Sequence, residues 1–193
     1  QKEALCRLLM LNCVTSDFAA LWQNGYSPEF QSFTWSKDDS RLPNWMFTSL
    51  TQEWRPNNVL RSDYMRRQAL LEIDVITAMK LGMSLNELKT IYTIKFPVLC
   101  KNEDDTWFDS TGRIVFTCST SIPNVGFDRR IWENSIMAAS SGQKFYRTIT
   151  DDTMQGGPIE RTIEYVAPFD CCDREQDYET AWKFFEEKYG KDE

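Results

Sequence analysis

Acidic side chains beside two predicted strands are the residues best suited to metal chemistry. Asp104, Asp105 and Asp109 lie on either side of a short predicted strand, and Asp151 and Asp152 follow another. Carboxylates gathered in this way could hold a divalent cation for phosphodiester cleavage. A nuclease of that kind should also have an acid-x-Lys pattern on one strand, and no predicted strand has one. We therefore favour solvated turn carboxylates, with a metal-dependent nuclease as an alternative.

The absence of histidine removes most other catalytic classes. The chain has no histidine at all, so it cannot build Ser-His-Asp or Cys-His nucleophile systems, HExxH metalloprotease sites or Cys/His zinc sites. It also lacks a GxGxxG or GxxxxGK[ST] phosphate-binding motif. Gly156, Gly157 and Pro158 fit a hairpin loop. No catalytic centre is predicted, and whether the chain is an enzyme stays open.

Basic residues are concentrated in the middle of an acidic chain. The net charge of −7 argues against a free-standing nucleic-acid binder, whose affinity comes from neutralising phosphates. Residues 54–101 nevertheless carry eight basic and four acidic side chains, whereas residues 102–193 carry ten and nineteen. The candidate phosphate contacts are Arg61, Arg66, Arg67, Arg129, Arg130, Lys144 and Arg147. Ordinary solvated surface charge is the alternative.

The stretch DYMRRQALLEID predicts a helix with charges on an otherwise apolar surface. At 100° per residue, Asp63, Arg67 and Asp74 fall within about 40° of one another, so they can form a structural ion network. Charges on a buried helix must be paired or must contact a partner. Arg66 lies off this stripe without an evident local partner, which makes it the first candidate for contact with phosphates or another domain.

The N-terminal half, residues 1–97, is predicted to be mainly helical. Apolar residues recur at spacings of three and four over 2–23, which indicates an amphipathic helix, with a break near Thr15. Turn residues and aromatics alternate through 25–58. This composition predicts an extended connection whose aromatic side chains plug into the core.

Two further helices follow this connection. The first covers 62–81 and is stopped by Gly82. Ser84 and Glu87 then form a capping box that starts the next helix. That helix must end before Pro97, because the residue before a proline disfavours helical geometry.

Residues 98–170 are predicted to form β-hairpins. A turn at Asp109–Gly112 precedes a β-branched and aromatic run, and two alternating runs at 144–150 and 161–169 flank a long loop. A closing helix occupies 171–190. The fold class is therefore α+β: a single domain of residues 1–193 in which a helical N-terminal half packs on a small antiparallel sheet of hairpins.

The chain has no run of eighteen apolar residues and no signal-peptide pattern, which predicts a cytoplasmic protein without membrane contact. Its six cysteines lack a CxxC pair and fit free thiols. It begins at Gln1, within a predicted helix, and this start suggests a fragment of a longer protein.

Four blocks of the sequence carry a family resemblance. They are LRSDYMRRQALLEIDVITAMKLGMSLNELKTIYTIKFPVL at 60–99, DTWFDSTGRIVFT at 105–117, VGF at 125–127 and DDTMQGGPIERTIEYVAPFDCCDREQDYETAWKFFE at 151–186. In this order they resemble the C-terminal region of large bacterial class I S-adenosylmethionine-dependent DNA adenine-N6 methyltransferases. These proteins are related to Eco57I-type restriction-modification and phage-defence proteins.

The resemblance implies a role outside the catalytic domain. The family's glycine-rich cofactor loop and NPPY-type motif do not occur here, so no cofactor is expected in this piece and S-adenosylmethionine is expected in the parent protein. The implied function is a non-catalytic C-terminal accessory or DNA-recognition module, with the rest of the parent chain and double-stranded DNA as partners. The alternative is a protein-interaction module that docks on a partner subunit or domain without touching DNA.

Overall fold

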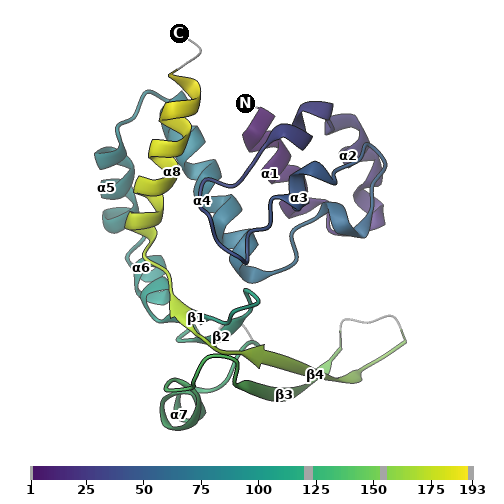
Figure 1. The fold of residues 1–193 in the computed structure, drawn as a ribbon, viewed down its shortest axis with the longest axis vertical. Helices are drawn as coiled ribbons and strands as arrows, with labels where there is room; N and C mark the ends of the chain where they lie inside the picture. Colours follow the sequence, from purple (N-terminus) through teal and green to yellow (C-terminus); the bar gives the residue numbers. More distant parts are fainter. Residues whose placement is uncertain (1, 120–123, 153–155, 191–193) are drawn as a thin grey trace. The chain divides into compact units, whose positions relative to one another are not determined.

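The computed structural model describes residues 2–119, 124–152 and 156–190, and it divides into two compact units (Figure 1). Unit 1 comprises Gln1–Lys95 and Arg174–Glu193, and unit 2 comprises Phe96–Asp173. Helices and small antiparallel sheets give the α+β class that the sequence predicts. The C-terminal helix belongs to the same unit as the N-terminal helices. The sequence had predicted a single domain of residues 1–193.

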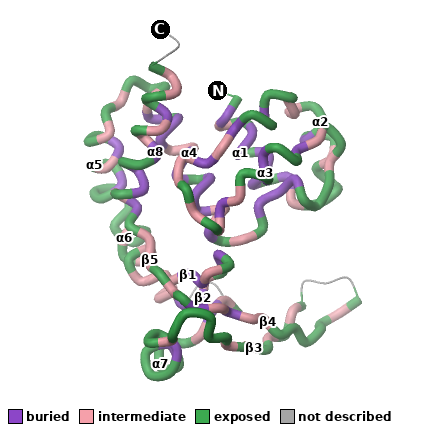
Figure 2. Tube along the Cα trace, viewed as in Figure 1, coloured by how far each residue is buried: buried purple, intermediate pink, exposed green. Residues whose placement is uncertain are grey.

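The described residues of unit 1 form helices and connecting segments but no strand. Its longer helices are α1 (Lys2–Asn12), α4 (Asp63–Lys80), α5 (Leu85–Lys95) and α8 (Arg174–Tyr189). Its shorter ones are η1 (Ser16–Phe18), α2 (Ala19–Gly25), η2 (Pro28–Ser32), α3 (Trp45–Thr48) and η3 (Pro56–Asn58). The predicted break near Thr15 separates α1 from η1 and α2. The buried residues of its longer helices lie mainly on α1, α4 and α8 (Figure 2).

Local capping defines the helix boundaries of unit 1. The Ser62 hydroxyl accepts a hydrogen bond from the amide of Met65 and so caps α4. At the start of α5, the Ser84 amide donates to Glu87 while the Glu87 amide donates to the Ser84 hydroxyl. This reciprocal pair is the predicted capping box. Gly82 adopts a φ of 71°, a conformation that suits glycine, at the corner between α4 and α5.

A buried arginine holds the core of unit 1 together. The Arg7 guanidinium on α1 is fully buried, forms an ion pair with the equally buried Glu72 of α4, and donates to the carbonyl of Thr34 at 2.9 Å. Glu72 also accepts hydrogen bonds from the amide and hydroxyl of Ser36. Burial alone would lower the pKa of Arg7, but the charges of Glu72 and Glu3 raise it above its ordinary value.

Aromatic rings enclose the same guanidinium. Its central carbon lies 5.2 to 5.7 Å from the ring centroids of Phe47, Trp35 and Phe185. At these distances the ring faces attract the cation. Three elements other than α1 and α4 therefore converge on Arg7: the segment around Trp35, helix α3 and helix α8.

The predicted aromatic connection is pinned to unit 1 by polar as well as apolar contacts. The indole nitrogen of Trp22 donates to the carbonyl of Thr51 at 2.8 Å. Asp39 accepts bonds from the guanidinium of Arg41 and, at 2.8 Å, from the hydroxyl of Tyr64 on α4. Arg41 also stacks 3.7 Å from the Tyr64 ring centroid. These bonds fix a segment that has little regular structure of its own.

The described residues of unit 2 form two small antiparallel sheets and three short helical segments. The three-stranded sheet has the order β2-β1-β5, from β1 (Thr106–Phe108), β2 (Ile114–Thr117) and β5 (Asp170–Cys171). The second sheet is a two-stranded ribbon of β3 (Lys144–Asp151) and β4 (Ile159–Val166), as the alternating runs predict. The helical segments are α6 (Pro97–Asp104), α7 (Arg129–Ile131) and the π-helical turn η4 (Trp132–Ile136).

The prediction of hairpins from residue 98 onward is wrong at its start, because residues Pro97–Asp104 form helix α6. Pro97 occupies the first turn, where its missing N–H is not needed. None of the α6 residues is buried. In the sequence this proline was interpreted only as the end of the preceding helix, although a proline in the first turn also fits the start of a new one.

Aromatic side chains form the core of unit 2. Trp132 stacks on Phe116 with ring centroids 5.5 Å apart and also contacts Trp107 and Phe169. Gly126 has a φ of 61°, and a Cβ at this position would lie 2.5 Å from the carbonyl oxygen of Val115. Only glycine permits this close approach of the loop to β2.

The Arg7–Glu72 pair predicts a non-additive stability effect. Arg7→Met should lower the free energy of unfolding by about 3–5 kcal/mol, because it leaves the Glu72 carboxylate buried without a cation. The double variant Arg7→Met/Glu72→Met should recover part of that loss. Urea unfolding measures both. Arg55→Met, which removes an exposed pair with Glu53, should cost less than about 1 kcal/mol. A single Arg7 variant as stable as the Arg55 control would contradict the assigned role.

Asp39 predicts a loss of stability in acid. Burial raises the pKa of Asp39, but hydrogen bonds from Arg41 and Tyr64 outweigh it and lower the pKa to about 2 from an ordinary 3.8. The carboxylate thus stabilises the fold above pH ~4 and loses this effect as the pH falls through about 2, by about 1–2 kcal/mol. Asp39→Asn should flatten that fall in urea unfolding, whereas Asp38→Asn should follow the wild type.

Candidate functional site

The charges of the predicted α4 stripe find partners on α8. Arg67 donates to the Asp177 carboxylate at 2.7 Å, and Asp177 also pairs with Lys37 at 2.8 Å. Asp74 accepts bonds from the guanidinium of Arg174 at 3.1 Å and the hydroxyl of Tyr178 at 2.9 Å. Two members of the ion network predicted for Asp63, Arg67 and Asp74, namely Arg67 and Asp74, thus pair with residues of α8. Burial places Arg67 away from a surface that phosphates could reach.

Two other predicted phosphate contacts, Arg66 and Arg61, donate to backbone carbonyls at the end of α1 and just beyond it. Arg66 donates to the carbonyl of Leu11 at 3.0 Å and to that of Leu60 at 3.2 Å. Arg61 donates to the carbonyl of Val14 at 3.2 Å. Carbonyls at a helix end carry partial negative charge, which arginine neutralises. The expectation that Arg66 lacks a local partner is therefore wrong. Arg61 remains exposed.

The arginine pair on α7 is divided between two environments. Arg129 pairs with Asp105 at 2.5 Å and with Glu133 at 3.1 Å, and it lies 4.9 Å from the Phe116 ring centroid. Its carboxylate hydrogen bonds raise the pKa of Arg129. The Arg130 side chain is exposed and makes no hydrogen bond or ion pair with the described residues.

The β3–β4 ribbon brings the last two predicted cations onto one element but onto opposite faces. Lys144 lies on the face that also carries Tyr146, Thr148, Thr150, Glu160, Thr162, Glu164 and Val166, which we call the threonine face. On this face Glu164 accepts bonds from Lys144 at 3.1 Å and from Tyr146 at 3.0 Å. The Glu164 hydrogen bond raises the pKa of Lys144. Lys144 is therefore locally neutralised.

Arg147 lies on the other side of the ribbon, which we call the arginine face. This face carries Phe145, Arg147, Ile149, Asp151, Ile159, Arg161, Ile163 and Tyr165. Its inner residues pack into the aromatic core of unit 2. Farther out, Arg161 stands opposite Ile149, diagonally across from Arg147. Arg161 pairs with Asp151 at 3.2 Å yet remains 64% exposed, and Arg147 has no hydrogen bond or ion pair within the described ranges.

The predicted acidic residues do not assemble into a metal site. Within residues 2–119, 124–152 and 156–190, no group of three or more Cys, Asp or Glu side chains is placed to hold a metal ion. Asp109 is fully buried and accepts bonds from the amides of Thr111, Arg113 and Val166. It ties the β1–β2 turn to β4. Asp105 pairs with Arg129, and Asp151 pairs with Arg161. Asp105, Asp109 and Asp151 therefore stabilise contacts within unit 2.

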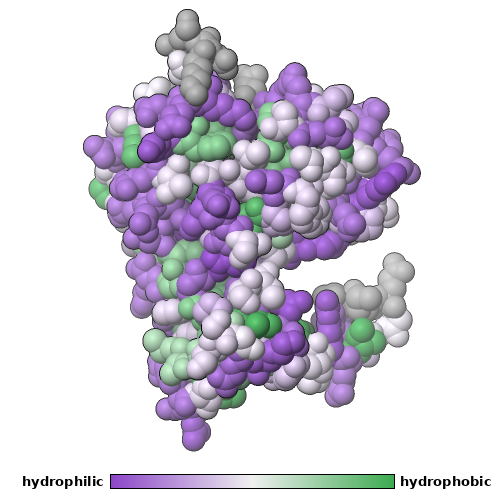
Figure 3. Space-filling view, in the orientation of Figure 1, coloured by the Kyte–Doolittle hydropathy of each residue, from purple (hydrophilic) through white to green (hydrophobic). Residues whose placement is uncertain are grey.

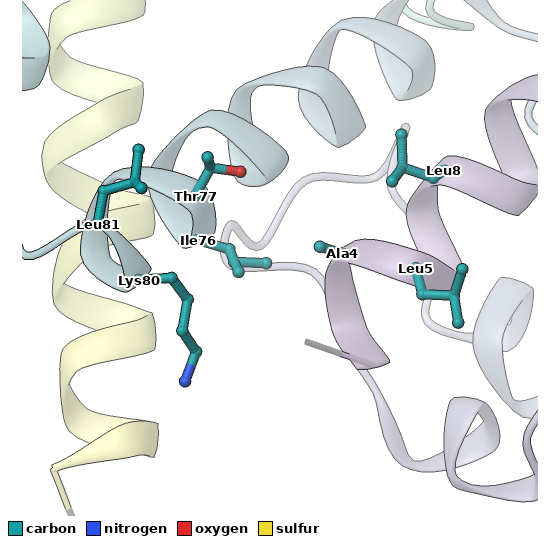
Figure 4. Close-up of a pocket in the computed structure, with 7 residues that line it drawn as sticks. All are labelled: Ala4, Leu5, Leu8, Ile76, Thr77, Lys80 and Leu81. Atoms are coloured by element: carbon teal, nitrogen blue, oxygen red, sulfur yellow. The ribbon is translucent and has the colours of Figure 1, made fainter.

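An apolar hollow lies between α1 and α4 in unit 1 (Figure 4). We call it the α1–α4 groove, and its volume is about 280 Å³. Its lining residues are Ala4, Leu5, Leu8, Ile76, Thr77, Lys80 and Leu81. In Figure 4 the Ile76 side chain extends from α4 toward Ala4 of α1, and the Lys80 side chain extends into the open space beside the two helices.

Comparison with known proteins identifies no relative of this chain, so the evidence on its function comes from the surfaces described above. No protein family model, no curated protein and no solved structure matches the chain. Across the described helices, none is both long enough and apolar enough to span a membrane. Hydrophilic residues dominate the face seen in Figure 3.

Two features were missed in the sequence. Arg161 was not among the predicted contacts, although the alternation of RTIEYV and its pairing with KFYRTIT places it on the same face as Arg147. The α1–α4 groove has a weaker signal. Leu5 and Leu8 fit the apolar side of an amphipathic helix, and sequence alone does not reveal that they remain 41% and 44% exposed.

Asp109 provides a test that separates structure from catalysis. Asp109→Ala should lower the free energy of unfolding by at least about 2 kcal/mol, because it leaves buried amides without an acceptor. Asp104→Ala, at an exposed position in α6, should change it little. Urea unfolding measures the effect, and plasmid cleavage with magnesium is assayed in parallel. Full stability together with loss of a cleavage activity would instead make Asp109 a metal ligand.

Proposed function

We propose that this chain is a non-catalytic accessory module of a bacterial DNA adenine methyltransferase or restriction-modification protein, and that it contacts duplex DNA through the arginine face of the β3–β4 ribbon. The chemistry would belong to the methyltransferase domain of the parent protein, which would bind S-adenosylmethionine. Work of this kind, including defence against phage, would take place in the cytoplasm. The sequence blocks at 60–99, 105–117, 125–127 and 151–186 support the parentage.

The observation that carries the DNA contact is the shape of the ribbon. Eight residue pairs give it a length of about 27 Å at roughly 3.4 Å per residue. Most of its residues are exposed or half-buried, as Figure 2 shows. A two-stranded ribbon of this kind fits the major groove of DNA. The aromatic core of unit 2 holds its inner end.

Charge on the ribbon supports a contact through one face. The arginine face carries two cations, Arg147 and Arg161, against the single carboxylate of Asp151, whose side chain is only 10% exposed. The threonine face carries Lys144 against Glu160 and Glu164. Phosphates should therefore approach the arginine face.

The net negative charge of unit 2 limits the expected affinity for DNA. Residues 96–173 carry seven basic and twelve acidic side chains, so this unit has a net charge of −5. Only a few phosphates can be neutralised. Such a module should bind DNA weakly by itself, with the parent chain supplying most of the affinity.

The ribbon predicts a shallow salt dependence. If Arg147 and Arg161 each neutralise one phosphate, the logarithm of the association constant should fall with the logarithm of salt concentration with a slope of about −2. Fluorescence anisotropy with labelled duplex DNA, between about 50 and 200 mM salt, measures it. Arg147→Ala/Arg161→Ala should flatten the slope and abolish most of the binding.

A control variant removes two positive charges from unit 1 and leaves the ribbon intact. Arg55→Ala/Lys183→Ala deletes two exposed cations of unit 1 and should leave the slope unchanged. If duplex DNA fails to bind at the lowest salt, the DNA contact is excluded. An equal loss in both double variants would show that general charge, and not the ribbon, is responsible.

A further inference from the structure

The α1–α4 groove exposes apolar side chains on both of its walls. Leu5 and Leu8 of α1 are 41% and 44% exposed, and Leu81, just beyond α4, is 71% exposed. Ile76 lines the groove although it is only 2% exposed, so it forms the floor. This surface lies in unit 1 and is independent of the ribbon in unit 2.

The two helices that form the groove run antiparallel. Arg66 near the start of α4 bonds the end of α1, Glu72 pairs with Arg7 in the middle, and Ile76 meets Ala4 near the α1 start. On α4 the exposed face continues to Leu70, seven residues before Thr77 and 50% exposed. Exposed apolar side chains thus extend along α4 from Leu70 to Leu81, beside Leu5 and Leu8 of α1.

An apolar surface of this shape suits a third helix. A helix lying along it can place apolar residues at positions i, i+3 or i+4, and i+7 between the ridges of α1 and α4. The groove volume of about 280 Å³ is below the range of roughly 300–1,000 Å³ for small-molecule pockets. It is therefore better matched to a few anchoring side chains than to a whole ligand.

The charge of the groove indicates which sign of charge the bound helix should carry. Lys80 is its single charged lining residue. The Lys80 ammonium lies 5.4 Å from the ring centroid of Tyr189 and is directed to the open end in Figure 4. A carboxylate on the bound helix would meet this cation, whereas a lysine or arginine would be repelled. We propose that the α1–α4 groove binds an amphipathic α-helix of a partner protein, anchored by apolar side chains and carrying an acidic residue opposite Lys80.

A displayed peptide library tests the proposal. The library encodes helices with apolar residues at i, i+3, i+4 and i+7 and random residues elsewhere, and it is selected against this chain. Selected peptides should share an aspartate or glutamate at one place relative to the anchors. Their affinity, measured by fluorescence anisotropy, should fall about tenfold or more for Leu8→Glu and for Lys80→Glu, which corresponds to about 1.4 kcal/mol.

Charge exchange and a matched control make the result specific. A peptide with its shared acid changed to lysine should regain affinity for Lys80→Glu. Leu21→Glu alters another exposed leucine, 53% exposed on α2, and should bind as the wild type does.

Two results would overturn the proposal. One is a selection that yields no binder, or only binders indifferent to Leu8→Glu and Lys80→Glu. The other is self-association in sedimentation velocity that Leu8→Glu abolishes, because the groove would then be covered by a second copy of this chain. Loss of DNA binding by the ribbon variants would affect neither result.

Discussion

The burial of the Arg7 guanidinium is the constraint on which unit 1 depends. A charge can be removed from water only where carboxylates, carbonyls and ring faces replace its hydration. Glu72, the Thr34 carbonyl and three aromatic rings do this here, and they come from separate parts of the chain. Helix α8 contributes Phe185 and also Lys188, which pairs with Glu3 of α1. Unless all these parts are in place, the charge is left unsatisfied.

The buried Arg7–Glu72 pair contributes more to the specific packing of α1 against α4 than to net stability. Replacing a buried ion pair by apolar groups can be neutral or stabilising, whereas removing one partner is costly. A helix pair held only by apolar packing could slide or rotate with small penalties. The Arg7–Glu72 pair admits one register of α1 against α4. That register sets which leucines of α1 remain outside and so creates the walls of the α1–α4 groove.

Ion pairs within the protein also determine which charges remain at the surface. Of the seven cations predicted to meet phosphates, Arg66 and Arg67 serve unit 1, while Arg129 and Lys144 pair with carboxylates of unit 2. Most of the candidate cations are thus engaged in contacts within the protein. The surfaces that remain are small and separate: an arginine face on a ribbon and an apolar groove with one lysine.

Local signals determined most of the elements. The capping box of Ser84 and Glu87, the corner at Gly82, the α4 periodicity and the alternation of both ribbon strands depend on neighbours in sequence, and the structure follows them. Helix α6 was missed because Pro97 was interpreted as the end of one helix and not also as the first turn of the next. Long-range pairing was decided by the tertiary structure. Arg67 meets Asp177 across 110 residues, and Arg66 finds carbonyls at the end of another helix. Sequence spacing gives the direction in which a side chain leaves its own helix, but the partner it meets depends on how distant segments pack.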